Sequence, residues 1–353
     1  MKFYCFSFLL LVLLACKQTD TQNLNSNSDQ NISYIKQMNW ENRGDSLIIK
    51  SENEQIIFKK EDLPIQSAMV IPTSVIAYLD ELNSLDKIKG VSQPDFIFNQ
   101  KIHTKLNQNE IEVIGTFNEI FIERVLVQQP DVFISTSSPT LAKFHELLKK
   151  QNIKVLLIDE YEELNPLAKA EYIKLMGILV GKEKEAETIF MEIEKNYLEI
   201  QNKVKNSSKN PPKILTNHMY GDVWYMPAGE SFQSILFEDA GGQYLWASSS
   251  GKGALNLSFE TVFEKANDAD VWMNAGDFPS KAALLASFPN YNWFKSFQNG
   301  RIYNWNKRKS ATGANDYFET GTARPDWVLK DLAAIFHPEL FPGHELVFYE
   351  KLE

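Results

Sequence analysis

The middle of the chain carries the pattern that most constrains its fold. Residues 167–205 have helical periodicity for nearly forty positions, with one interruption near Gly181. In the second half, apolar side chains recur in steps of four and three residues and form one helical face: Ala186, Phe190, Ile193, Tyr197, Ile200 and Val204. A helix of about 24 residues is roughly 36 Å long. We therefore expect a stiff helix that spans a whole lobe, with a separate body at each end.

Both flanking regions alternate short buried strands with helices. Before the long helix, a β-rich start is followed by strands at Ala68–Ile71 and Val132–Ser135, each next to a helix. After it, "KILTNHMY" and "RIYNWN" read as strands between helices. This alternation is typical of parallel sheets with helical crossovers. The prediction is an α/β fold of two Rossmann-like lobes, residues 32–165 and 206–353, joined by a helix pair at 166–205.

The first fifteen residues are typical of an export signal. Lys2 precedes an apolar run of about ten residues, Phe6–Ala15, whereas a bilayer-spanning helix needs about twenty. Cys16 directly follows Leu-Leu-Ala, which resembles the bacterial lipobox, in which the signal is cut before a Cys that is then lipidated. The alternative is an ordinary cleaved signal followed by a chance Cys. We expect 1–15 to be a signal peptide, Cys16 to be the lipidation site and 16–31 to be a flexible tether.

Charge and missing motifs exclude several function classes. The formal net charge of −10 argues against nucleic-acid binding and against lying on an anionic membrane surface. The five His residues include no pair at i, i+4, so the sequence predicts no metal site and leaves bare-metal transport a weak alternative. No G-x-S-x-G, H-E-x-x-H or C-x-x-C motif occurs, and we expect no enzyme; an extracytoplasmic hydrolase is the weakly supported alternative.

Four segments in order resemble the substrate-binding lipoproteins of bacterial ATP-driven importers for iron complexes and vitamin B12, in their Bacteroidetes-type form. The resemblance runs from about Ser67 to the C-terminus, in "IEVIGTFNEIFIERVLVQQPDVFIS", "AEYIKLMGILVGKEKEAETIFMEIEKNY", "FEDAGGQYLW…LSFETVFEKANDADVWMNAG" and "RPDWVLKDLAAIFHPELFPGHELVFYEKL". It implies the class III periplasmic-binding-protein fold, with a rigid helix between the lobes and little hinge motion.

The same resemblance implies a function. An exported, lipid-anchored monomer at the periplasmic face of a membrane would capture a siderophore, haem or cobalamin between its lobes. It would deliver this ligand to an inner-membrane ABC permease dimer, with no cofactor of its own. The alternative is a surface-exposed lipoprotein that captures a ligand and passes it to an outer-membrane receptor.

Two glutamates are the expected permease contacts. In the family, one Glu on each lobe docks onto permease arginines, and the matching segments "FIERVL" and "LSFETVF" place these at Glu123 and Glu260. Charge pairs at the rim of an interface favour orientation and association rate. The alternative is that each Glu is simply favoured in the first turn of its helix by the helix dipole.

The loops at the strand ends supply the expected ligand contacts, because ligands of such folds bind at the carboxyl ends of the strands. These loops are Pro72–Ser74, Gln93–Phe96, Ser135–Ser138, Tyr220–Tyr225, Trp246–Lys252 and Asn274–Phe278, together with the stretch 305–317. A wide cleft needs aromatic walls and a few polar or cationic groups. We predict that the contacts are Ser137, Tyr220, Trp224, Trp246, Arg308 and Tyr317. The alternatives are a core position for the two Trp residues and a solvated loop for Arg308. His218 also follows a strand and could face the cleft.

Overall fold

The computed structural model describes residues 32–52, 54–116, 119–207 and 210–353. The predicted signal peptide, Cys16 and the tether therefore lie outside the described residues. Within the described part, no helix combines the length and the apolar character needed to cross a bilayer.

The N-terminal lobe is built on a five-stranded parallel sheet of order β6-β5-β4-β7-β8. Its strands are β4 (Ala68–Val70), β5 (Ile88–Ser92), β6 (Glu112–Gly115), β7 (Val132–Ser135) and β8 (Val155–Leu157). The helices of this lobe are α1 (Thr73–Glu81), α2 (Gln100–Asn107), α3 (Ile122–Gln128) and α4 (Ala142–Lys150). An antiparallel meander precedes the lobe: β1 (Met38–Arg43), β2 (Ser46–Ser51) and β3 (Gln55–Lys59).

The C-terminal lobe has a second five-stranded sheet, of order β12-β9-β14-β15-β16, in which only β16 runs antiparallel. Its strands are β9 (Lys213–Thr216), β12 (Gln243–Tyr244), β14 (Val271–Met273), β15 (Ile302–Asn304) and β16 (Glu350–Lys351). A small antiparallel sheet lies beside it: β10 (Met219–Tyr220), β11 (Val223–Pro227) and β13 (Ala254–Leu257). The helices are α7 (Phe232–Asp239), α8 (Phe259–Ala266), α9 (Lys281–Ser287), α10 (Lys295–Gln298), α11 (Thr320–Ala323) and α12 (Pro325–Phe336).

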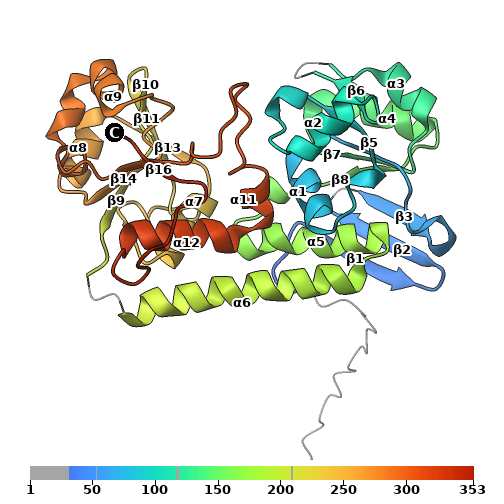
Figure 1. Ribbon diagram of the computed structural model, residues 1–353, viewed down its shortest axis with the longest axis horizontal. Helices are drawn as coiled ribbons and strands as arrows, with labels where there is room; N and C mark the ends of the chain where they lie inside the picture. Colours follow the sequence, from blue (N-terminus) through green and yellow to red (C-terminus); the bar gives the residue numbers. More distant parts are fainter. Residues whose placement is uncertain (1–31, 53, 117–118, 208–209) are drawn as a thin grey trace, which may run out of the picture.

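Two helices connect the lobes, α5 (Pro166–Val180) and α6 (Glu183–Ser207), and α6 runs beneath both lobes in Figure 1. Gly181 ends α5 in the left-handed region, at φ +73°. Of the predicted apolar face of α6, Ile200 is partly buried and the other five side chains are buried. Gly177 lets the two helices approach closely, because a Cβ there would lie 2.4 Å from the Cβ of Ala186. The predicted α/β fold with a long connecting helix is confirmed.

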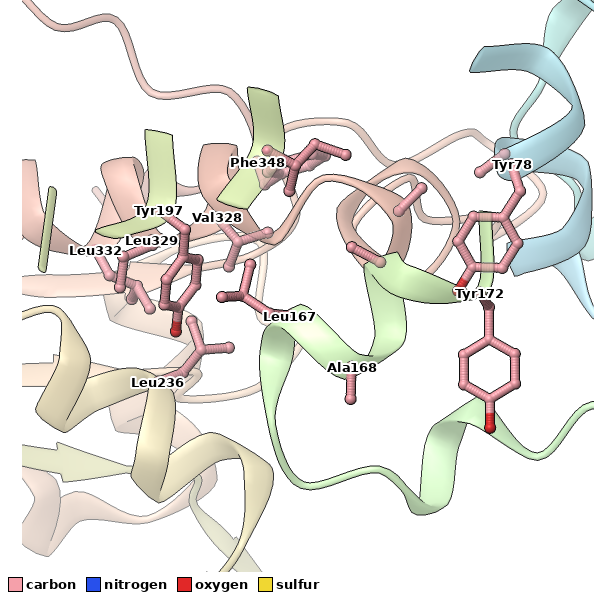
Figure 2. Close-up of a cluster of buried hydrophobic side chains, with 14 of the residues drawn as sticks. Tyr78, Leu167, Ala168, Tyr172, Tyr197, Leu236, Val328, Leu329, Leu332 and Phe348 are labelled. Carbon is pink, nitrogen blue, oxygen red and sulfur yellow. The ribbon is translucent and has the colours of Figure 1, made fainter. Parts of the chain in front are cut away.

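A single hydrophobic cluster runs from one lobe into the other. Figure 2 shows its central part, where Tyr172 of α5 and Tyr78 of α1 lie at one end. Leu167 of α5 lies in the middle, close to Val328 of α12 and Leu236 of α7. Separating the lobes would bring this apolar surface into water, which is unfavourable. The packing therefore favours a small change in the angle between the lobes, which stays a prediction.

Candidate functional site

A cavity of about 680 Å³ lies where the carboxyl ends of the strands of the C-terminal lobe face the N-terminal lobe. Asn217 and His218 follow β9, and Asn274 follows β14. Asn304 ends β15. The N-terminal lobe contributes Thr73, at the start of α1, and Phe96, in the loop after β5. The site thus forms at the edge where ligands of open α/β sheets bind.

Aromatic rings form much of the wall. Phe96, Tyr220 and Phe318 are 55%, 77% and 54% exposed, although large aromatic side chains are usually well buried. Tyr225 also lines the cavity, and the Trp305 ring stacks on the Tyr317 ring at 4.8 Å. Exposed rings that converge from both lobes on one cavity suit a large ligand with flat or apolar surfaces.

Two asparagines leave amide groups without partners at the cavity. Both side-chain polar atoms of Asn274 are buried and make no hydrogen bond of normal geometry, although the amide lies close enough to the Tyr349 phenol to act on its pKa. Asn304 donates from Nδ2 to the carbonyl oxygen of Gly276 at 2.8 Å, but its Oδ1 is buried and unpaired. An unsatisfied buried polar group costs about 1–3 kcal/mol. These amides are therefore available to donate to, and accept from, a polar group on a ligand.

The charged groups around the cavity compensate one another. Asp277 and Lys309 form an ion pair. Burial lowers the pKa of His218, so its imidazole is neutral at pH 7; its ring packs edge-on against Phe278 at 5.4 Å. The described part of the wall therefore has no uncompensated charge. Among the described residues, no group of three or more His, Cys, Asp or Glu could hold a metal ion.

Of the six predicted ligand contacts, only Tyr220 lines this cavity; His218, which was also expected to be able to face the cleft, lines it as well. Tyr317 lies behind the wall, stacked on Trp305. Ser137 lies in a separate depression, where its backbone N–H donates to Asp159 at 2.8 Å and its hydroxyl also bonds to that carboxylate.

The structure contradicts the predicted cleft positions of Trp224 and Trp246. Trp224 is fully buried in β11, stacks on Trp272 at 5.7 Å and donates from Nε1 to the carbonyl oxygen of Thr216 at 2.9 Å. Trp246 is 5% exposed and packs near Tyr244. Side chains alternate along a strand. The neighbour of Trp224, Tyr225, therefore faces the cavity in its place.

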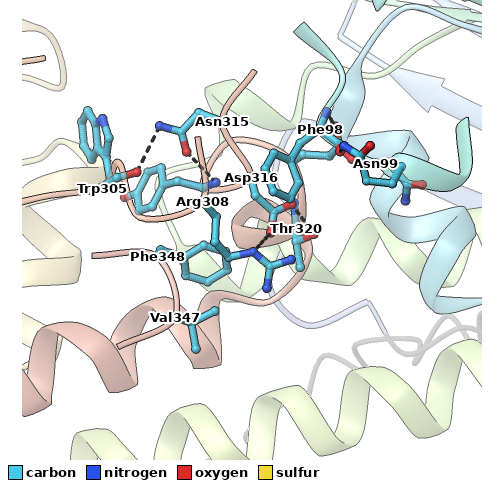
Figure 3. Close-up of polar contacts among 12 residues, drawn as sticks. Phe98, Asn99, Trp305, Arg308, Asn315, Asp316, Thr320, Val347 and Phe348 are labelled. Atoms are coloured by element: carbon cyan, nitrogen blue, oxygen red, sulfur yellow. Dashed lines mark hydrogen bonds and ion pairs between the residues drawn. The ribbon is translucent and has the colours of Figure 1, made fainter. Parts of the chain in front are cut away.

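Arg308 is also not placed as predicted, since it does not line the cavity. Its guanidinium pairs with Asp316 at 2.8 Å and lies 5.4 Å from the centre of the Phe98 ring, on the other lobe (Figure 3). The segment 305–319, here called the crossing loop, rises between the lobes before α11 (Figure 1). The hydroxyl of Thr312 donates to the carbonyl oxygen of Asp95 at 3.0 Å. Arg308 therefore takes part in joining the lobes.

Several further residues line the cavity without being among the six named contacts, although Phe96, Tyr225 and Asn274 lie in the strand-end loops that were expected to hold the ligand. Tyr225 lies within β11, and the others follow or end a strand or lie in the crossing loop: Phe96, Asn274, Asn304, Trp305 and Phe318. Asn274 carried a usable signal, since Asn is one of the few residues that tolerates the left-handed backbone found there, at φ +55°.

Glu123 and Glu260 are exposed in the first turns of α3 and α8. These helices belong to different lobes, and both lie away from α6 in Figure 1. The backbone N–H of Glu260 and the Ser258 hydroxyl lower the pKa of the Glu260 carboxyl. Both carboxylates are exposed, one on each lobe.

A family model described as "Periplasmic binding protein" matches residues 73–309, from the start of α1 into the crossing loop. The chain belongs to the periplasmic binding protein family. A relative of this binding protein is an uncharacterised lipoprotein of Methanocaldococcus jannaschii, 29% identical over 308 residues, or 83% of this chain and 70% of that protein.

Two solved structures show the same fold at low identity. A possible iron-binding periplasmic solute-binding protein from Staphylococcus epidermidis has a TM-score of 0.61 at 17% identity, covering 77% of this chain and 98% of that one. A periplasmic haem-binding protein from Pseudomonas aeruginosa has a TM-score of 0.59 at 17% identity, covering 82% and 98%. The resemblance seen in the sequence is confirmed at the level of family and fold.

Proposed function

We propose that this periplasmic binding protein is an extracytoplasmic lipoprotein that captures an iron chelate, haem or cobalamin and delivers it to the permease of an ABC importer. The observation that carries this proposal is the interlobe cavity of about 680 Å³, with aromatic walls and unpaired amides.

The cavity matches this ligand class in size and chemistry. Its volume lies within the range of about 300–1,000 Å³ that is usual for small-molecule sites. The aromatic rings offer flat apolar contact, and the amides of Asn274 and Asn304 offer a few polar contacts. The names of the two structural neighbours, one for iron and one for haem, support the same class.

An absorbance titration tests the ligand class. The purified protein is titrated with haemin, cyanocobalamin and a panel of ferric siderophores, while Trp fluorescence is followed. We expect one of them to bind saturably at sub-micromolar concentration and Tyr220→Ala to weaken that binding at least tenfold. Tyr161→Ala is the matched control, since Tyr161 is also an exposed Tyr (54%) but lies outside the cavity. Absence of saturable binding to every member of the panel would refute the ligand class.

Each helix that carries a proposed permease contact also bears or contacts an exposed apolar side chain. Val127 is 83% exposed one turn after Glu123 on α3. On α8, Glu260 lies between Phe259 and Phe263 in sequence, and both pack against Trp293, which is 51% exposed. An exposed acid and an exposed apolar side chain at one helix of each lobe suit a permease that must bind this protein and then let it go. Charges at the rim of an interface act mainly on the orientation and the association rate of the two partners.

Charge reversal separates docking from ligand capture. Glu123→Arg with Glu260→Arg should abolish importer-dependent uptake in cells while leaving ligand affinity within twofold of the wild type. Glu185→Arg is the matched control, since Glu185 is also exposed in a first helical turn, that of α6. Unchanged uptake in the double variant would favour the capture lipoprotein that serves an outer-membrane receptor.

The lipid anchor is the third part of the proposal. It rests on the "LLAC" segment that ends at Cys16 and on the lipoprotein relative. Several acyl chains would hold the protein firmly at a membrane, since each buried methylene contributes about 0.8 kcal/mol. Cys16→Ser should move the protein from the membrane fraction to the soluble fraction and abolish its labelling by radioactive palmitate. Labelling that persists in the variant would place the anchor elsewhere or exclude it.

A further inference from the structure

A smaller chamber of about 180 Å³ lies directly behind the wall of the main cavity. Trp305 and Phe318 line both spaces and therefore form part of the wall between them. The rest of the chamber is mainly apolar, with Phe232 of α7 and Val328 of α12 among its walls. Its volume excludes a whole metal chelate but accommodates one arm of a ligand whose body lies in the main cavity.

The chamber contains one charged side chain. Lys169, in the first turns of α5, lines it, and its ammonium lies 4.0 Å from the centre of the Phe232 ring. Among the described residues, this ammonium has neither an ion pair nor a hydrogen bond. Burial lowers the pKa of Lys169, while Glu160 and Glu163 act on it from a distance and raise that pKa. Burial also raises the pKa of Glu160, while the charge of Lys169 lowers it.

An ammonium in an apolar chamber is only partly compensated. A cation–π contact contributes about 0.5–2 kcal/mol, which is small beside the cost of removing a charge from water. A carboxylate brought in by a ligand would supply the missing counterion in a site of low dielectric, where the pair is stronger than in water.

We propose that the chamber bounded by Lys169, Phe232, Trp305 and Phe318 binds a carboxylate on a short apolar arm of the ligand. This inference rests on the proposed function, because it assumes that the body of the ligand fills the adjoining cavity. A carboxylate-binding chamber would distinguish among the candidate ligands. A haem, whose propionate arms are acids, satisfies Lys169, and so does a siderophore with a free carboxylate, whereas a ligand with only neutral amide arms leaves the ammonium unpaired.

A small probe tests the chamber alone. The protein is titrated with 3-(4-bromophenyl)propionate and with the corresponding amide, and crystals soaked in the acid are used to locate bromine by anomalous scattering. We expect bromine in the chamber, and the acid should bind at least tenfold more tightly than the amide. Lys169→Gln should abolish this preference. Lys203→Gln should keep it, since the Lys203 ammonium makes the same kind of contact, 4.5 Å from the Phe341 ring, outside the chamber.

Equal binding of acid and amide, no binding of the acid, or bromine outside the chamber would each overturn the inference. Haemin and its dimethyl ester then test the arm on a whole ligand, and Lys169→Gln should remove any preference for the free acid. The two proposals fail separately. Binding of the bromophenyl acid in the chamber without saturable binding of any chelate refutes the proposed ligand class alone. If a carboxylate-bearing chelate binds the wild type and Lys169→Gln with the same affinity, only the carboxylate site in the chamber is refuted.

Discussion

The backbone N–H of Phe98 donates a hydrogen bond of 2.8 Å to the carboxyl of Glu319, so that a buried acid at the end of the crossing loop joins the two lobes. Glu319 is 2% exposed. The pKa of its carboxyl is raised from 4.5 to about 8, mainly by burial and to a smaller extent by the charge of nearby Asp316. The N–H groups of Phe98 and Asn99 favour the charged form, but burial outweighs them, so at neutral pH the carboxyl is mostly protonated and its carbonyl oxygen accepts the hydrogen bond.

Glu319 should make the stability of the protein depend on pH. The folded state holds the Glu319 proton more tightly than the unfolded state. Its contribution is therefore complete below pH 4.5 and is lost as the pH rises to about 8. Through this one group, the free energy of unfolding falls by at most about 1.4 kcal/mol for each pH unit. Urea unfolding between pH 5 and 8.5 should show a flatter profile for Glu319→Gln than for the wild type, and parallel profiles would contradict the assignment.

Arg324 should be the most sensitive charged residue between the lobes. Its guanidinium pairs with buried Asp326 through contacts of 3.0 and 2.9 Å, and it also lies 3.5 Å from Glu81 of α1. Arg324→Met leaves the Asp326 carboxylate buried and unpaired, which should cost about 3–5 kcal/mol in the free energy of unfolding. Lys195→Met is the control, since its pair with Glu199 is exposed and should matter by less than about 1 kcal/mol.

The spacing of α5 and α6 should depend on Gly177. Ala normally favours a helix over Gly by about 1 kcal/mol. Here the added Cβ would lie 2.4 Å from that of Ala186, so Gly177→Ala should instead destabilise the protein by about 1–3 kcal/mol. Ala186→Gly in the same chain removes the clashing atom and should recover part of the loss. A Gly177→Ala protein as stable as the wild type would mean that the helices can shift apart freely.

The sequence was sufficient for the features that depend on local periodicity. The apolar steps from Ala186 to Val204 predicted α6, and the strand expected at Ala68–Ile71 next to a helix corresponds to β4 and α1, which begins at Thr73. The alternation of strands and helices predicted two parallel sheets and hence the edge at which the cavity lies. These features are fixed by neighbours within one or two turns of the chain.

The individual cavity residues depend on contacts that periodicity does not contain. Trp224 and Tyr225 are adjacent and both aromatic, and only the pairing of β11 decides which of them turns inward. Arg308 lies in a cationic loop that suits an anionic ligand, but its position is set by Asp316, eight residues later, and by Phe98, on the other lobe. Long-range contacts of this kind account for most of the differences between the predicted and the observed positions of the site residues.

The unpaired amide of Asn274 should favour ligand binding at the expense of stability. Without a ligand, its buried donor and acceptor are unsatisfied, and its backbone is left-handed at φ +55°. Asn274→Gly removes both costs and should raise the free energy of unfolding of the ligand-free protein by about 1 kcal/mol. The same change should weaken binding of the chelate that saturates the wild type about tenfold, or about 1.4 kcal/mol.

Asn109→Gly separates these two effects. Asn109 has the same backbone conformation, at φ +57°, but is exposed and lies outside the cavity. Its replacement should bring only the small gain from relief of the backbone and should leave the affinity unchanged. Urea unfolding of both variants and the absorbance titration give the two quantities independently. If Asn274→Gly behaves like Asn109→Gly in both measurements, the Asn274 amide has no part in holding the ligand.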